Sequence, residues 1–282
     1  MESNILKKLA KLGMKLNKHI KMITILFLTA CVNPKGMTYT KLSNPEIRLQ
    51  QYKDALDWYL ENTTMKILLV ENSGYDFSDC YQKQIREGRL EFICYDGNDY
   101  DRRRGKGYGE AAIMEYGFAH SLLVDQNSGL QIIKITGRLI VRNINELCHS
   151  CNNANTVYAN ISKDDWNGNI ATSQVVMAPK DFYFHYFLTR REEINDSQCR
   201  HFEHVLYDGI VEWKKAGGRH RMFWTPPKLE GMSGTHGTKI CSTISGVQLL
   251  RYHIMYILRQ YFGYRGYENP FYHGQPKKAL SV

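Results

Sequence analysis

The 282-residue sequence predicts an α/β fold, in which a mostly parallel central sheet is flanked by helices and preceded by a basic amphipathic helix. Three observations support this fold class. Short apolar runs alternate with helical patterns in the first half of the chain, turn and capping residues separate them, and their spacing suits strand–helix–strand units. The hydrophobic content of 43% and the charged content of 23% are typical of a soluble globular protein.

The first expected element is the basic helix, over residues 3–21. Its apolar side chains fall on one narrow stripe, and all six lysines lie outside it. The stripe consists of Ile5, Leu9, Leu12, Leu16 and Ile20. Two interpretations stay open: the helix packs against its own domain, or it lies on an anionic membrane surface to which the lysines are attracted.

The apolar run from Met22 to Cys31 also has two interpretations. A lysine-rich start followed by Leu28-Thr29-Ala30-Cys31 resembles a bacterial lipoprotein signal, in which Cys31 would carry the lipid after cleavage. The run is too short to span a bilayer, which needs about 20 apolar residues. Alternatively, residues 23–30 are the first strand of the fold.

The residues after this run favour the strand. Asn44 is a natural helix cap and Pro45 suits the first helical position, so a helix is expected from there to about Asn62. Residues 65–72 then predict a second buried strand. A strand, a helix and a strand at this spacing form a unit whose strands pair in parallel.

The alternation continues along the chain. We expect a short helix over 80–88, a strand over 90–95, a helix over 109–121 and a strand over 131–141. Parallel α/β sheets bind ligands outside the carboxyl ends of their strands. A ligand is therefore expected where these strands end, near Thr29 to Asn33, Glu71 to Ser73, Tyr95-Asp96 and Arg138.

A glycine cluster opens the helix over 109–121. Gly105, Gly107 and Gly109 alternate with Lys106 and Tyr108, and Glu110 follows. Glycines allow a backbone to approach a ligand closely, and a helix N-terminus attracts anions. The spacing matches neither a Walker motif nor a dinucleotide fingerprint, so a plain turn remains the alternative to a diphosphate site.

Beyond residue 141 the pattern is less regular. Strands are expected over 156–161 and 170–177, a helix from His201 to Trp213, a long loop over 226–237 and a last helix over 245–261 that packs on the sheet. We divide the chain into the helix of residues 1–21, a first α/β half over 22–141 and a second half over 142–282. The two halves form one continuous domain.

Charge and cysteine usage exclude several classes of protein. More than half of the net charge of +9 comes from residues 1–21, which argues against a nucleic-acid groove in the folded body. Seven scattered cysteines suit free thiols in a reducing compartment. Cys148-His149-Ser150-Cys151 has zinc-like spacing, but no second pair of ligands completes it, so no metal site is predicted.

Taken together, residues 22–240 resemble nucleotide-sugar-dependent glycosyltransferases with a Rossmann-like GT-A fold, of the kind that assemble bacterial capsule and lipopolysaccharide. The resemblance rests on the strand–helix–strand opening, on Gly105 to Arg138, and on the loop from Gly231 to Gly237. It implies a nucleotide-sugar site at three groups of residues. They are Thr29, Ala30, Asn33 and Glu71 for the nucleoside, Gly105, Lys106, Gly107, Gly109 and Glu110 at the glycine cluster, and Ser233, Gly234 and Thr235 in a closing loop.

The chain departs from this family at the metal site. GT-A enzymes commonly carry Asp-x-Asp after the fourth strand, whereas this sequence has Lys134-Ile135-Thr136-Gly137-Arg138 there. Asp99-Tyr100-Asp101 spells the motif, but its neighbours Arg102 to Arg104 indicate a solvated, self-paired loop. We expect Lys134 and Arg138 to neutralise the leaving phosphate without a cofactor, and Mn²⁺ or Mg²⁺ is not favoured. A structural Arg138 and an exposed Lys134 are the alternative.

A transferase also needs a group that takes the proton of the acceptor hydroxyl. Glu203, with His204 beside it, is the first candidate, and Asp164, Asp165 and Glu230 are reserves. Glu203 and His204 could instead lie on the surface of an amphipathic helix.

The predicted function is that of a hexosyltransferase-like glycosyltransferase that moves a sugar from a nucleotide-sugar donor to a bacterial surface polysaccharide or lipid-linked glycan. We expect it in the cytoplasm, at the inner face of the cell membrane. The alternatives are a cell-envelope lipoprotein lipidated at Cys31, a nucleic-acid binder that uses Arg102 to Arg104 and Lys106, and a different nucleotide-using enzyme of the same fold, such as a nucleotidyltransferase.

Overall fold

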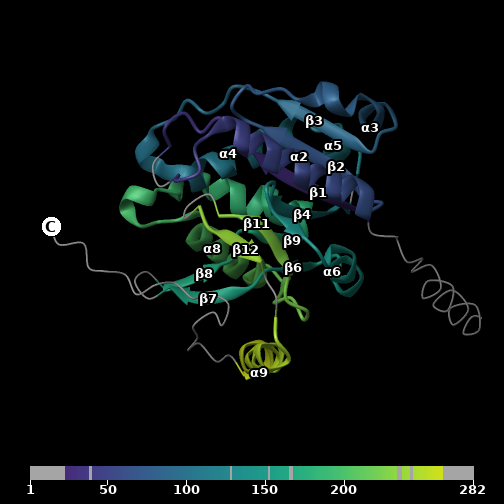
Figure 1. The fold of residues 1–282 in the computed structure, drawn as a ribbon. Helices are drawn as coiled ribbons and strands as arrows, with labels where there is room; N and C mark the ends of the chain where they lie inside the picture. Colours follow the sequence, from purple (N-terminus) through teal and green to yellow (C-terminus); the bar gives the residue numbers. More distant parts are fainter. Residues whose placement is uncertain are drawn as a thin grey trace, which may run out of the picture.

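A computed structural model describes residues 23–37, 40–127, 129–151, 153–164, 168–233, 237–241 and 244–262 of the chain (Figure 1). The basic helix expected over residues 3–21 and the loop residues Gly234 and Thr235 lie outside these ranges. Within them, no helix is both long enough and apolar enough to cross a membrane.

Seven strands form the central sheet, in the order β10-β6-β9-β4-β1-β2-β3. Their bounds are β1 (Thr24–Ala30), β2 (Lys66–Glu71), β3 (Leu90–Cys94), β4 (Gln131–Thr136), β6 (Thr156–Tyr158), β9 (Val175–Pro179) and β10 (Arg219–Arg221). β1 pairs in parallel with β2 and with β4, and β2 pairs in parallel with β3. β9 alone runs against its neighbours, and β10 is parallel to β6. The prediction of a mostly parallel α/β fold is confirmed.

Helices cover both faces of the sheet. The longer ones are α2 (Pro45–Asn62), α4 (Gly105–His120), α8 (Phe202–Lys215) and α9 (Gly246–Phe262). The shorter ones are α3 (Gln82–Arg86), α5 (Leu122–Asp125), α6 (Ile144–Ser150) and α7 (Lys180–Phe182), with short η turns such as η1 (Ser78–Tyr81), η2 (Arg102–Arg104) and η4 (Leu188–Glu193). The cap predicted for α2 is confirmed, because Asn44 Oδ1 accepts a hydrogen bond from the Ile47 amide at 3.0 Å.

The core has two layers, one on each face of the sheet. Alternate residues of β1 enter opposite layers, as the two-residue period of a strand requires. Phe27 packs with Met114 of α4 and Val205 of α8 in one layer. Leu26 and Leu28 pack with α2 and α6 in the other. β1 is therefore buried on both faces and paired on both edges.

The central position of β1 argues against the alternative in which the chain is cleaved before Cys31 and lipidated there. Cleavage before Cys31 would remove all of β1, and β2 and β4 would lose the strand that separates them. Such a product could not keep the central sheet described here. The structure therefore favours residues 23–30 as a strand of the fold over a discarded signal.

Several predicted elements are wrong in their bounds. The strand expected over 131–141 stops at Thr136, because the chain turns at Gly137, and resumes as β5 (Ile140–Val141). The strands expected over 156–161 and 170–177 are shorter, and a hairpin of β7 (Ile161–Asp164) and β8 (Gly168–Ala171) lies between them. The expected loop over 226–237 contains β11 (Leu229–Met232), which pairs with β12 (Lys239–Cys241) and with β5.

Two helical predictions also change. α4 begins at Gly105 rather than Gly109, since the η2 turn leads directly into it and Asp101 Oδ1 accepts from the Arg103 amide. The last helix was expected to pack on the sheet. Instead α9 packs at the β10 edge of the sheet, against the His220 carbonyl and the segment that comes after β10, and lies at the margin of the molecule (Figure 1).

Candidate functional site

The carboxyl ends of β1, β2 and β4 meet at one edge of the sheet. Ala30 is in register with Glu71, and Thr29 is in register with Thr136. β9 runs in the opposite direction, so the residues just before it reach the same edge, and the Thr136 amide donates to the Gln174 carbonyl. The sheet thus gathers the loops after three parallel strands and before one antiparallel strand.

A buried ion pair joins this edge to α4. Lys134 Nζ lies 2.5 Å from Glu110 Oε1, and the Lys134 side chain is only 1% exposed. The hydroxyls of Thr29 and Thr136 donate to the same carboxylate oxygen, at 3.0 Å and 3.2 Å. Burial by itself would raise the pKa of Glu110, but the Lys134 ammonium and these hydrogen bonds outweigh it and hold the pKa below its usual value.

This pair changes the roles expected for both residues. Lys134 also donates to the Ser173 carbonyl at 2.7 Å, and its charge is balanced by Glu110. The alternative of an exposed Lys134 is wrong. A lysine that is buried and already paired is suited to positioning the edge rather than to direct contact with a phosphate.

Glu203 comes close to this cluster through one serine. Ser173 Oγ donates to Glu203 Oε1 at 2.6 Å, while the Ser173 carbonyl accepts from Lys134. The adjacent Phe202 ring lies 5.2 Å from Lys134 Nζ. The structure thus brings Glu203 and Lys134, two of the four predicted catalytic residues, to the same edge.

His204 is not on the surface of α8, contrary to one interpretation of the sequence. Its side chain is 2% exposed, and its Nδ1 accepts from the backbone amide of His201 at 3.2 Å. His201 in turn caps α8 and pairs with Asp196 at 2.9 Å. His204 therefore belongs to the start of the helix, and its buried ring completes the helix cap.

Arg138 lies at the same edge, after the turn that ends β4. Its side chain is 9% exposed, and Nη1 donates to the Met232 carbonyl at 3.4 Å. Its Nε is buried and has no hydrogen-bond partner among the described residues. Burial lowers the pKa of this guanidinium, although an arginine remains charged. A buried, charged donor without a partner is costly, and an anion bound there would satisfy it.

Two further arginines lie, like Arg138, near Cys31 at the end of β1, and neither was predicted as part of the nucleotide-sugar site. Arg48 is 6% exposed and donates from Nε to the Cys31 carbonyl at 2.9 Å. Arg102 Nη1 donates to Asn98 Oδ1 at 3.1 Å. Burial raises the pKa of the Cys31 thiol to about 11, and all three guanidinium groups act on it in the opposite direction. Three cations therefore converge on the end of β1.

A signal for Arg48 was present in the sequence. It begins the series Arg48, Tyr52, Ala55, Leu56 and Tyr59, whose helical spacing places it on the buried face of α2. An arginine within an apolar face needs a specific set of partners, and here they are backbone carbonyls and the Tyr52 hydroxyl at 3.2 Å. No such spacing in the sequence distinguishes Arg102 from its neighbours Arg103 and Arg104.

Glu71, expected to contact the nucleoside, instead anchors the loops at this edge. Its carboxylate accepts from the backbone amides of Val32, Ser73 and Tyr75, each at 2.9 Å. The Asn33 amide donates to Ser73 Oγ at 2.9 Å, and Ala30 is 1% exposed. Thr29, Ala30, Asn33 and Glu71 thus lie together as expected, but the Glu71 oxygens are occupied by backbone donors.

The glycine cluster has a packing explanation. A Cβ at Gly105 would lie 1.9 Å from Asp196 Oδ2, one at Gly107 would lie 3.0 Å from Phe202 Cβ, and one at Gly109 would lie 2.0 Å from the Tyr100 hydroxyl. Side chains of the protein therefore cover the first turn of α4. Lys106 is exposed. These side chains block the N-terminus of α4, where a diphosphate was expected to bind. The cations that remain near the carboxyl edge of the sheet are the arginines.

Two predicted loops are placed as well. Asp101 pairs with Arg103 at 2.8 Å, which agrees with the self-paired loop expected there. Ser233 bonds to Thr238 and Gly237 through its backbone, one residue after the Met232 carbonyl that Arg138 contacts. Among the described residues, no group of three His, Cys, Asp or Glu side chains could hold a metal ion.

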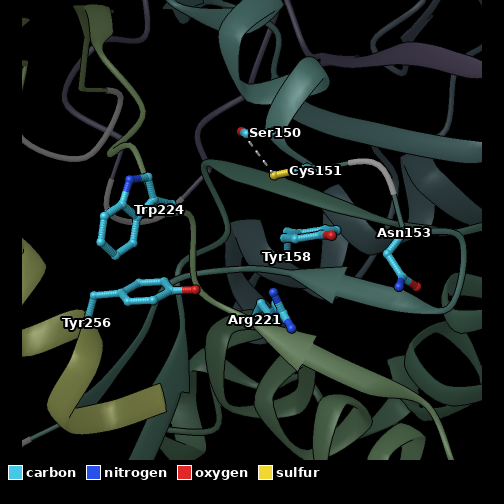
Figure 2. A pocket seen from close by; sticks show the side chains of 7 residues that line it. All are labelled: Ser150, Cys151, Asn153, Tyr158, Arg221, Trp224 and Tyr256. Carbon is cyan, nitrogen blue, oxygen red and sulfur yellow. Dashed lines mark hydrogen bonds between the residues drawn. The ribbon is translucent and has the colours of Figure 1, made fainter. Parts of the chain in front are cut away.

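A cavity of about 170 Å³ lies elsewhere, between the end of α6, the strands β6 and β10, and α9 (Figure 2). Its lining residues are Ser150, Cys151, Asn153, Tyr158, Arg221, Trp224 and Tyr256. Tyr158 belongs to the core layer on the α2 and α6 face, opposite to the layer of Phe202. None of the predicted site residues lines this cavity.

Solved structures to which the chain shows low similarity include the following two. One is a 4-diphosphocytidyl-2C-methyl-D-erythritol synthase, with 12% identity, a TM-score of 0.39 and coverage of 84% of this chain and 99% of the other. The second is a nucleoside-diphosphate-sugar pyrophosphorylase from Vibrio cholerae RC9, with 12% identity, a TM-score of 0.35 and coverage of 71% and 91%. No family model and no curated protein matches the chain. Likeness this distant says nothing of substrate or activity.

Proposed function

We propose that the chain is a nucleotide-sugar-using transferase of the glycosyltransferase type, with the donor diphosphate bound at the carboxyl edge of β1 and β4. The observation that carries this proposal is the buried Nε of Arg138, which lacks a partner among the described residues and lies where Arg48 and Arg102 also converge. Parallel α/β sheets bind ligands at this edge, and guanidinium groups match phosphate oxygens in a bidentate fashion.

The arginines would act on the leaving group. Breaking the bond between the sugar and the diphosphate leaves negative charge on the departing oxygen, and a fixed cation stabilises that charge as it grows. Arg138 is the residue we assign to this contact. Lys134 and Glu110 are positioning residues in this proposal, because they hold the end of β4 and the first turns of α4 together.

Glu203 is the group that we propose as base for the acceptor hydroxyl. Its carboxylate lies at the same edge as Arg138 but on the α8 side of the sheet, held by Ser173. An acceptor that enters between these two groups would meet a proton acceptor on one side and the sugar of the donor on the other. General-base help of this kind contributes roughly 10²–10⁴-fold to a rate.

We also propose an acceptor for the sugar and a location for the protein in the cell. A glycan or lipid-linked glycan of a bacterial surface polysaccharide is the acceptor that the sequence resemblance supports. An enzyme of this kind works at the inner face of the cell membrane, and the lysines of residues 1–21 suit such a surface.

The test is a thermal-shift panel of UDP-, GDP-, CMP- and dTDP-sugars, measured in EDTA, because a ligand that binds the native state raises the melting temperature. We expect one donor to raise it, and we expect Arg138→Ala to weaken that donor about tenfold to a hundredfold, from the loss of one charge-assisted contact. Arg138→Lys should recover only part of the affinity.

Arg103→Ala is the matched control, because the Arg103 side chain is 82% exposed and pairs with Asp101. It should leave donor binding unchanged. No shift with any of the four donors, or a shift that requires Mn²⁺, would overturn the proposal. Product analysis distinguishes the two kinds of transferase: release of a nucleoside diphosphate, or of CMP from a CMP-sugar, supports a glycosyltransferase, while release or use of pyrophosphate indicates a nucleotidyltransferase.

A further inference from the structure

The outer face of α9 is apolar. Val247 is 79% exposed, Leu250 62%, Ile254 50% and Ile257 41%. Their spacing of three, four and three residues places them on one stripe, about 80° wide at about 100° per residue. A contiguous aliphatic stripe in water marks an interaction surface rather than a scatter of single exposed residues.

The inner face of α9 carries the polar groups. The Tyr252 hydroxyl donates to Asn160 Oδ1 at 3.2 Å and to the Phe223 carbonyl. Gln260 bonds to the backbone of Met222 and of His220, each at 3.3 Å. These contacts, made by one residue near the middle of the helix and one in its last turn, fix its rotation. The aliphatic stripe is therefore turned outward by specific bonds, and it cannot be buried by rolling the helix over.

An exposed tryptophan lies beside the stripe. Trp224 is 48% exposed, stacks on His253 with ring centroids 4.3 Å apart, and meets Tyr256 edge-on at 5.0 Å. Figure 2 shows Trp224 and Tyr256 next to each other among the residues that line the cavity. Amphipathic rings of this kind are enriched where a protein meets the headgroups of a bilayer.

The charge around the stripe decides which partner fits. Neither α9 nor the segment 219–228 contains an acidic residue, whereas Arg219, Arg221 and Arg251 are exposed. A second copy of the chain, paired about a two-fold axis, would bring these arginines together without a carboxylate to oppose them. An anionic bilayer offers both a hydrophobic interior for the stripe and negative headgroups for its rim.

We propose that α9 lies flat on an anionic membrane surface, with its aliphatic stripe among the acyl chains and Trp224 at headgroup depth. This proposal uses neither residues 1–21 nor the donor site, so its test does not depend on the proposed activity. The helix spans 17 residues, and its docking would hold the β10 side of the molecule against the membrane.

The test uses the full chain and vesicles of phosphatidylcholine with or without phosphatidylglycerol. We expect co-sedimentation with the anionic vesicles, weakened by salt. The double variant Leu250→Asp/Ile254→Asp should bind at least about tenfold more weakly, because it replaces buried aliphatic area with charge. Leu122→Asp is the matched control, since Leu122 is 65% exposed on α5, and its binding should equal that of the wild type.

A second measurement identifies the contact itself. Lipids brominated near the headgroup should quench the tryptophan fluorescence of the wild type, and Trp224→Phe should lose that quenching while it still binds. Unchanged binding of the α9 double variant, or quenching that persists in Trp224→Phe, would overturn the proposal. So would a dimer in solution that the double variant dissociates, because the stripe would then be an interface between copies.

Discussion

Lys134 and Glu110 form an ion pair across 2.5 Å between β4 and α4, and the lysine side chain is 1% exposed. Two threonine hydroxyls, from Thr29 and Thr136, complete the coordination of the carboxylate. The pair thus fastens the first turns of α4 to the ends of two strands. It places a fixed cation at the carboxyl edge of the sheet, but its charge is neutralised within the protein.

The two partners of this pair should be strongly coupled. Lys134→Met or Glu110→Gln alone leaves a buried polar or charged partner, and each should lower the free energy of unfolding by about 3–5 kcal/mol. The double variant should cost much less than the sum. Chemical denaturation of the four proteins measures this coupling, and additive losses would show that the pair does not act as a unit.

Acid should weaken the protein partly through Glu110. The pKa of this carboxyl is lower in the folded protein than its ordinary value of 4.5, so its ionised form stabilises the fold. That contribution is complete above 4.5 and is lost as the pH falls through the lower folded value. The difference in unfolding free energy between the wild type and Glu110→Gln should therefore shrink on acidification below 4.5, and a constant difference would contradict this.

Tyr59 should matter for both stability and donor binding. Its buried hydroxyl donates to the Leu139 carbonyl and accepts from the Val141 amide, each at 2.9 Å, and so holds the turn that carries Arg138. Tyr59→Phe leaves both backbone groups without this partner and should cost about 2–3 kcal/mol in urea denaturation.

In the same variant, donor affinity should fall as well, because Arg138 loses its fixed position. Tyr75→Phe serves as the control, since Tyr75 is 41% exposed. If Tyr59→Phe is less stable but binds the donor with wild-type affinity, then this turn does not position Arg138 for donor binding.

Gly117 should resist substitution. A Cβ there would lie 2.6 Å from Val70 Cγ2 and 3.2 Å from Phe27, where α4 crosses β2 and β1. Overpacking costs about 1–3 kcal/mol, which exceeds the gain of up to about 1 kcal/mol in helix propensity. Gly117→Ala should thus lower the melting temperature, and Val70→Ala should restore part of it. Gly246→Ala, where no neighbour lies within 4 Å, should be neutral or stabilising.

The elements that the sequence predicted well are those specified locally. Asn44 and Pro45 mark the start of α2, and the apolar runs of β1 and β2 are buried on both faces as a central parallel sheet requires. The turn after Thr136 was not anticipated. It depends on Gly137, whose Cβ would lie 2.6 Å from the Thr29 carbonyl, a contact between residues far apart in the chain.

The candidate site was only partly predictable for the same reason. Sequence alone placed Lys134 within a strand, Arg138 at the end of that strand and Glu203 on a helix, but it could not show that Glu110 neutralises Lys134. The pairing joins residues from different elements, and no local pattern encodes it. Arg48 was missed although its helical spacing places it on the buried face of α2, because most of its partners are backbone carbonyls, which no residue pattern identifies.

The carboxylate of Glu71 has a consequence for how a ligand would arrive. By accepting three backbone amides, it sets the shape of the loops after β1 and β2 before anything binds. These loops therefore lose little conformational entropy when a ligand binds. Association should accordingly follow a single kinetic phase, limited by encounter rather than by rearrangement of these loops.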